Sequence, residues 1–296
     1  MSKKIVFTGA TRNFFKIGYQ AITYLSDNYP DVEVCLAIPN VSEARGVCEG
    51  MDVELVEWDP GDYGTLEGVY DGATSTLLVP PIMDRVAVGG AKAEKASQAG
   101  VEFIVCLGVQ HKNGQTALSR DVAELTSVLE QGKSDYCVLR LPMFLENLLY
   151  QMRSISEDGV FGFPCGGNRR FSYVSCSDLG PMVAEMLVNG SRVDDRLLSA
   201  AEQTTCFEIA EAFSRVLDRP IKFERIGDEE FMHSLLKDTG SAASIKAASG
   251  ILELWKQIHG GKEEPADPYL GELLQRPPET AVDWIKDHAC FFQRNP

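Results

Sequence analysis

The segment that most constrains this chain is the strand, loop and helix pattern of residues 4–25. A short apolar run at 5–7 is followed by Gly9, and a helical pattern begins at about Ile17. In doubly wound α/β folds, this order places the pyrophosphate of a dinucleotide at a helix N-terminus. The pattern therefore predicts that the chain opens with a Rossmann-type unit.

The glycines of this first loop are unusual. A standard dinucleotide loop carries three glycines, whereas only Gly9 and Gly18 are present here, with bulky and basic residues at 12–16 between them. A bulky side chain keeps the backbone away from the pyrophosphate. Two interpretations stay open: the loop no longer binds phosphate and packs its two phenylalanines, or it bulges and Arg12 or Lys16 supplies positive charge.

The first 140 residues alternate apolar strands with helical stretches. Helices are predicted at 83–98 and 117–131, and six strands at 5–7, 32–38, 53–58, 75–81, 101–108 and 136–142. Continuous apolar strands separated by helices indicate a parallel sheet that is covered on both faces. The predicted class is α/β, a Rossmann-type doubly wound parallel sheet with a smaller C-terminal α/β substrate lobe.

The pattern changes after Pro142, so we predict a dinucleotide-binding domain at 1–150 and a smaller lobe at 151–296. Segments of the lobe are expected to cross back to the Rossmann core. The later part is predicted to contain a helix at 143–152, a Gly-rich loop at 159–170, a strand at 171–175, a helix from Ser177, a strand at 221–226, a helix at 228–240 and a helical tail at 251–293.

Charge and cysteine usage narrow the classes of partner. The net charge of −15 over 296 residues disfavours nucleic acid and anionic membranes, which need a basic surface. The eight cysteines show no CxxC pair and no zinc spacing, so no metal site is expected. With no signal-peptide pattern and no long apolar run, we expect a reducing, cytoplasmic location and a small-molecule substrate, and leave a protein partner open.

Several blocks occur in an order similar to that of a known family. The most specific is VLRLPMFLENLL at 138–149, and the others are KIVFTGAT at 4–11, VELVEWDPGD at 53–62, FSYVSCSDLGPMVAEML at 171–187, DRPIKFERIGDEEF at 218–231 and TAVDWIKDHACFF at 280–292. Together they resemble the NmrA-like group of atypical short-chain dehydrogenases/reductases. The resemblance implies a Rossmann fold that binds NADP or NAD. It also implies a reductase of quinones and related small molecules, or a non-catalytic regulator that senses the nicotinamide pool.

The expected cofactor contacts follow from this resemblance. Gly9 and Thr11 would contact the pyrophosphate through backbone groups, with charge from Arg12 or Lys16, and Gly18 would take the place of the last loop glycine. Asp59 resembles the family's carboxylate at the adenine edge, although a turn before Pro60 explains it equally well. Val79 and Pro80, at the end of a strand, complete the set. Ile38 and Pro39 stand where the family often carries the arginine that selects NADP.

The usual catalytic pair of short-chain dehydrogenases is missing. No YxxxK motif occurs anywhere in the chain. His111 follows the fifth predicted strand and is the candidate acid/base, because an imidazole can exchange a proton near neutral pH. A solvated loop histidine is the alternative. Phe144, Asn147, Tyr150, Phe161 and Tyr173 are expected to bind substrate, although such aromatic residues also serve as core.

These observations favour an NAD(P)H-dependent reductase of a small apolar carbonyl, quinone or enone. Two alternatives stay open. The first is a nicotinamide-sensing regulator without catalysis, and the second is a protein that uses the pocket for non-redox chemistry without cofactor.

Overall fold

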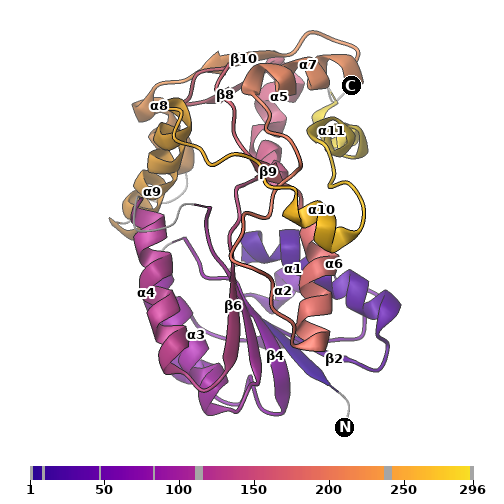
Figure 1. The fold of residues 1–296 in the computed structure, drawn as a ribbon, viewed down its shortest axis with the longest axis vertical. Helices are drawn as coiled ribbons and strands as arrows, with labels where there is room; N and C mark the ends of the chain where they lie inside the picture. Colours follow the sequence, from indigo (N-terminus) through magenta and orange to yellow (C-terminus); the bar gives the residue numbers. More distant parts are fainter. Residues whose placement is uncertain are drawn as a thin grey trace. The chain divides into compact units, whose positions relative to one another are not determined.

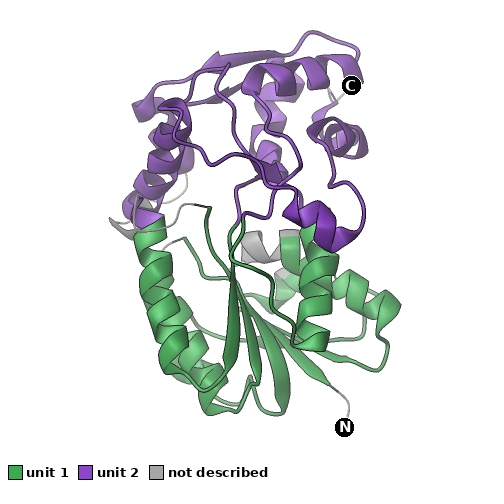
Figure 2. Cartoon of the chain, viewed as in Figure 1, with its two compact units in different colours: residues 1–115, 119–140, 176–196 green, residues 116–118, 141–175, 197–296 purple. Residues whose placement is uncertain are grey.

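The computed structural model describes residues 3–8, 11–46, 48–82, 84–110, 116–236 and 242–293, and does not place the side chains of 11–16, 43 and 242–244. The chain forms two compact units (Figure 2). Unit 1 comprises residues 1–115, 119–140 and 176–196, and unit 2 comprises 116–118, 141–175 and 197–296. In the described part of the chain, no helix has the length and apolar character needed to cross a membrane.

Unit 1 is built on a six-stranded parallel sheet with the order β3-β2-β1-β4-β5-β6. The order reverses direction between β1 and β4, which is the switch point of a doubly wound sheet. This confirms the predicted α/β class with a Rossmann-type parallel sheet. The strands are β1 (Lys4–Thr8), β2 (Glu33–Ile38), β3 (Val53–Glu57), β4 (Ala73–Leu78), β5 (Phe103–Leu107) and β6 (Asp135–Leu139).

Helices cover both faces of this sheet (Figure 1). The helical segments are α1 (Thr11–Asn28), α2 (Val41–Arg45), η1 (Tyr63–Leu66), α3 (Arg85–Gln98), α4 (Ala117–Gln131, of which 117–118 count with unit 2) and α6 (Cys176–Asn189). One face carries a core that includes Val6, Val88, Cys106 and Leu125. On the other face α1 packs on α6, where a Cβ built on Gly180 would lie 2.3 Å from the Gln20 Cβ. Glycine at this position therefore permits the close helix contact.

Helix α1 begins earlier than the sequence predicted. It starts at Thr11, only three residues after β1 ends at Thr8. The prediction that residues 12–16 form a long loop is wrong, because their backbone lies in the first turns of α1. Ile17, Ala21 and Leu25 are buried at helical spacing along the same element. This apolar periodicity begins at Ile17, so it does not show that the helix starts six residues earlier, at Thr11.

The division into units differs from the predicted boundary at residue 150 in three places, of which the short segment 116–118 in unit 2 is the smallest. Residues 141–150 belong to unit 2, and residues 176–196 return to unit 1 as α6 and the segment after it. Within unit 1, the Ser75 hydroxyl on β4 donates to the Leu187 carbonyl on α6 at 2.8 Å. This contact between segments far apart in sequence ties α6 to the sheet.

Unit 2 contains two small parallel pairings, β7 with β9 and β8 with β10. Its core is aromatic: Phe163 stacks on Trp255 with ring centroids 4.2 Å apart, and Phe213 packs edge-on against Phe292 at 4.8 Å. The elements are β7 (Met143–Phe144), η2 (Leu145–Gln151), α5 (Met152–Asp158), β8 (Val160–Phe163), β9 (Tyr173–Val174), α7 (Cys206–Val216), β10 (Lys222–Arg225), α8 (Asp228–Leu236), α9 (Ala242–His259), α10 (Tyr269–Leu274), α11 (Ala281–Asp287) and η3 (Ala289–Phe292).

Two local predictions in unit 2 are wrong. The expected helix at 143–152 is β7 followed by the 3-10 helix η2, and the expected loop at 159–170 contains β8. A Cβ on Gly162 would lie 2.6 Å from the Ile226 Cγ2 and 3.0 Å from the Glu224 carbonyl oxygen. Gly162 thus lets β8 approach β10 closely, so the glycine that suggested a loop is a requirement of strand pairing.

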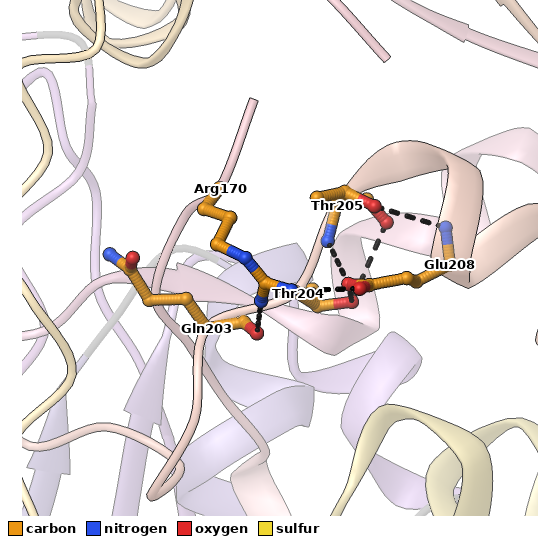
Figure 3. Close-up of polar contacts among 5 residues, drawn as sticks. All are labelled: Arg170, Gln203, Thr204, Thr205 and Glu208. Atoms are coloured by element: carbon orange, nitrogen blue, oxygen red, sulfur yellow. Dashed lines mark hydrogen bonds and ion pairs between the residues drawn. The ribbon is translucent and has the colours of Figure 1, made fainter. Parts of the chain in front are cut away.

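The N-terminus of α7 is held by a reciprocal capping box (Figure 3). The Glu208 amide donates to the Thr205 hydroxyl at 3.1 Å, and the Thr205 amide donates to the Glu208 carboxylate at 2.8 Å. Arg170 donates to the same carboxylate at 3.0 Å and to the Gln203 carbonyl at 2.7 Å. The preceding loop is therefore attached to the helix start by charge-assisted bonds.

Candidate functional site

The candidate site lies at the carboxyl edge of the unit 1 sheet, at β1 and β4, where the strand order reverses. Parallel α/β sheets bind ligands at this position. The Val79 amide donates to the Thr8 carbonyl at 3.1 Å, so the pairing of β1 and β4 continues to the edge. Because α1 begins at Thr11, its N-terminal amides belong to this same edge, where an anion would be favoured.

Most of the predicted phosphate contacts lie in residues 9–16, for which the structure describes only part of the backbone and no side chains. Gly9 lies outside the described residues, as do the side chains of Thr11, Arg12 and Lys16. Gly18 is buried within α1 rather than at its start. A role for these residues in binding phosphate stays a prediction.

The end of β4 presents an apolar wall. Val79 is 4% exposed, and Pro80 is buried with its Cβ 3.3 Å from a Cβ built on Gly89 of α3. The two predicted contacts thus lie at the edge of the sheet, packed on α3.

Asp59 follows β3, and its carboxylate is engaged in a local turn. Oδ1 accepts from the Gly61 amide at 2.8 Å, and the Asp59 amide donates to the Thr65 hydroxyl at 2.8 Å. This is the turn role that the sequence left open. At the end of β2, Asn40 similarly caps α2 by accepting from the Ser42 amide at 3.1 Å.

Two cationic side chains on α3 are buried, and sequence reasoning missed both. Arg85 is 7% exposed and Lys92 is 1% exposed. Lys92 Nζ lies over the ring of Trp58, the residue after β3, 4.5 Å from its centroid. Burial lowers the pKa of Lys92 to about 7 and also lowers the pKa of Arg85. The two residues are seven positions apart, which places them on the same face of a helix, and this spacing is what the sequence offered for predicting that they share an environment.

The segment after β5 is tied to the end of β6. Arg140 donates to the Gln110 backbone carbonyl at 2.6 Å, and its Nε lies 3.6 Å from the Asp195 carboxylate. Gly108 allows this approach, because a Cβ there would lie 2.8 Å from the Leu139 carbonyl oxygen. His111, the predicted acid/base, lies outside the described residues, immediately after the residue that Arg140 holds.

The predicted substrate residues in unit 2 divide into two groups. Tyr150 is 61% exposed, and Phe144 and Asn147 are half-buried. Phe161 is fully buried in the aromatic core, and the hydroxyl of buried Tyr173 accepts from the Ala281 amide at 3.3 Å. Phe161 and Tyr173 therefore pack and position this unit, whereas the first group has surface to offer a ligand.

Glu146, within the ENLL block, is a structural residue in unit 2. Its carboxylate accepts from the buried Trp284 Nε1 at 3.2 Å, so it links η2 to α11. Among the residues that the structure describes, no three or more His, Cys, Asp or Glu side chains are grouped to hold a metal ion.

Comparison with known proteins adds to this geometry. A curated reductase of Streptomyces griseus subsp. griseus, (4-alkanoyl-5-oxo-2,5-dihydrofuran-3-yl)methyl phosphate reductase, is 26% identical over 300 residues, which cover 97% of this chain and 99% of that protein. No protein-family model matches the chain.

Solved structures extend the comparison. The NADPH-dependent quinone oxidoreductase of Escherichia coli in complex with NADPH superposes with a TM-score of 0.77 at 19% identity, covering 96% of this chain and 99% of that one. A mutant of NmrA superposes with a TM-score of 0.74 at 13% identity, covering 99% and 97%.

The chain has an NmrA-like fold. The resemblance noted from the sequence blocks is thereby confirmed for the fold, over nearly the whole length of the chain. The NmrA-like architecture places the switch point, the start of α1 and the segment after β5 in one unit.

Proposed function

We propose that this NmrA-like protein is an NAD(P)H-dependent reductase of a small carbonyl, quinone or enone. The observation that carries the proposal is the full-length likeness to the Streptomyces griseus reductase. The E. coli quinone oxidoreductase, which shares the fold, is complexed with NADPH. This likeness favours catalysis over a purely regulatory role.

The described residues fit a dinucleotide at the carboxyl edge of unit 1. The start of α1 offers helix N-terminal amides to a pyrophosphate, and the predicted contacts Val79 and Pro80 lie at the same edge, where the described structure buries them. We propose that Gly9 and Thr11 contact the pyrophosphate through backbone groups, with charge from Arg12 or Lys16. When bound, a reduced nicotinamide supplies a hydride.

The chain itself must then supply a proton and orient the substrate. We propose His111 as the proton donor. The residue before it, Gln110, is bonded through its carbonyl to Arg140. Phe144, Asn147 and Tyr150 are proposed substrate contacts, because each keeps exposed surface.

The name of the Streptomyces griseus relative directs the choice of substrate. It describes an alkanoyl-substituted oxo-dihydrofuran on a methyl phosphate. In a 2,5-dihydrofuran with these substituents, the ring double bond is conjugated to carbonyl groups. Enones of this kind are therefore the first substrates to test, followed by quinones.

A two-stage experiment tests the proposal. Binding of NAD, NADH, NADP and NADPH is measured by titration, and then oxidation of the bound reduced cofactor is followed at its nicotinamide absorbance with an enone and quinone panel. We expect saturable binding of a reduced cofactor and oxidation that depends on substrate. Binding without turnover across the panel would favour the regulatory alternative, and no binding of any of the four would contradict a dinucleotide site.

A further inference from the structure

The two buried cations of α3 differ in how they tolerate burial. Lys92 can release its proton, and its Nζ lies over Trp58. Arg85 neither releases its proton nor lies over an aromatic ring among the described residues. A guanidinium stays protonated in proteins, and no described residue accepts a hydrogen bond from Arg85 or forms an ion pair with it. Its Nε is fully buried without a partner.

Asp121 is a described carboxylate in the surroundings of Arg85, and it does not form an ion pair with the guanidinium. Asp121 of α4 and Cys106 of β5 are near enough to favour its charged form, but no carboxylate lies within ion-pair distance in the described part of the chain. Burying an unpaired charge is strongly unfavourable. Within the residues that the structure describes, Arg85 therefore carries a buried positive charge without a paired anion.

Arg85 is also the first residue of α3, a helix of fourteen residues. The preceding Asp84 has φ of 52° and its side chain does not cap the helix. The amides of the first helical turn have no partner within a helix, and the helix dipole adds positive potential there. The unpartnered Arg85 Nε and the helix start without a side-chain cap belong to the same turn of α3, and each favours an anion near that turn.

This position lies at the carboxyl edge of unit 1. The helix follows β4 through the apolar segment of Val79 and Pro80, and Pro80 packs on Gly89, one helical turn beyond Arg85. Cys106, near Arg85, is the next-to-last residue of β5. Arg85 therefore lies at the start of the helix that follows β4 and near the carboxyl end of β5.

We propose that Arg85 and the N-terminus of α3 form a binding site for an oxyanion of the phosphate type on a ligand of this protein. In a chain of net charge −15, such a site supplies the local positive potential that an anionic ligand needs. The inference rests on the proposed function in assigning the anion to a ligand of the reductase. The oxyanion belongs either to the substrate or to the dinucleotide.

The test uses the full chain and inorganic phosphate as the probe. Phosphate is titrated by calorimetry and by thermal unfolding at constant ionic strength, with chloride as the balancing salt. We expect phosphate to bind saturably to the wild type. Because a hydrogen bond to a charged group contributes about ten- to hundredfold in affinity, Arg85→Gln should weaken phosphate binding by about that factor.

Two further variants distinguish a loss of phosphate binding at Arg85 from a loss of protein stability. Arg192 is an exposed arginine of unit 1 that pairs with Asp135 at the start of β6, and Arg192→Gln should leave phosphate binding unchanged. Arg85→Met removes an unpaired buried charge, so the ligand-free variant should unfold at the same temperature as the wild type or higher. Unchanged phosphate binding in Arg85→Gln, or a clearly lower unfolding temperature for Arg85→Met, would overturn the proposal.

A parallel titration with NADPH identifies the source of the oxyanion. Weaker NADPH binding by Arg85→Gln, together with competition between phosphate and NADPH, assigns the oxyanion to the dinucleotide. Unchanged NADPH binding assigns it to the substrate. Neither titration requires turnover, so failure of this site is distinguishable from failure of the reductase proposal.

Discussion

The amine of Lys92 lies over the indole of Trp58, with Nζ 4.5 Å from the ring centroid. Lys92 is 1% exposed, and no described residue accepts a hydrogen bond from it. An attraction between a cation and an aromatic ring recovers only part of the cost of removing an ammonium from water. The pair is therefore a local source of instability inside unit 1.

Replacing Lys92 with Met should stabilise the protein by roughly 4 kcal/mol at neutral pH, the scale of a pKa shift of this size. The pKa of Lys92 falls from 10.5 to about 7 on burial. Below pH 7 the folded and unfolded states both carry the proton, so the advantage of Met is then largest and constant.

The pH dependence of this advantage provides the check. Between pH 7 and 10.5 the unfolded state binds more protons, so wild-type stability rises by up to about 1.4 kcal/mol per pH unit. The advantage of Lys92→Met should shrink over that range in denaturant unfolding curves. Lys95→Met, on the same helix, is the control. A difference between wild type and Lys92→Met that does not change with pH would contradict the argument.

Gly180→Ala should destabilise the protein by roughly 2–3 kcal/mol through overpacking. The added Cβ would lie 2.3 Å from the Gln20 Cβ and 2.8 Å from the Gln20 carbonyl carbon, so α1 and α6 would have to separate. Gly46→Ala, where a Cβ meets nothing within 4 Å, should be close to neutral. Equal unfolding midpoints for the two variants would count against the close contact of α1 with α6.

Thr205→Ala should cost about 1 kcal/mol, the usual contribution of an N-cap. The change removes the hydroxyl that accepts from the Glu208 amide at 3.1 Å. Thr205→Ser keeps a hydroxyl and should retain most of the stability. Denaturant unfolding followed by circular dichroism measures both, and a serine variant as weak as the alanine variant would assign the effect to the lost methyl group.

The double variant Arg12→Ala with Lys16→Ala should weaken dinucleotide binding by about 1–3 kcal/mol, the scale of charged hydrogen bonds. Both residues lie in the first turns of α1. Fluorescence titration with NADPH measures the loss. The matched control changes Lys133 and Arg192, two exposed residues of unit 1, and identical curves for both double variants would refute a charge contribution from α1.

His111→Ala should reduce turnover by about 10²–10⁴-fold, the contribution of a general acid or base. It should leave the unfolding temperature and the affinity for cofactor unchanged, because the change concerns the reacting proton alone. His233→Ala, at an exposed position on α8, should have no effect on turnover. Full activity of the His111 variant would return this residue to the surface role and leave catalysis to hydride positioning.

Some features of the fold were readable from the residues alone. The strands β1, β2 and β5 were predictable because each is apolar on both faces, as a covered parallel strand must be. Helix α4 was predicted at 117–131 and occupies those residues, since its apolar periodicity is strong. In each case the order of apolar and polar residues within one element reflects which of its faces are buried.

At the candidate site, the sequence by itself could not decide the roles of individual side chains. It predicted the parallel sheet and the place of His111 after the fifth strand. Only the tertiary structure decided that Asp59 bonds within its own turn, that Phe161 is core and that the buried Arg85 Nε has no hydrogen-bond partner among the described residues. The physical reason is that periodicity reports the burial of one segment, whereas these roles depend on side chains that approach from other segments.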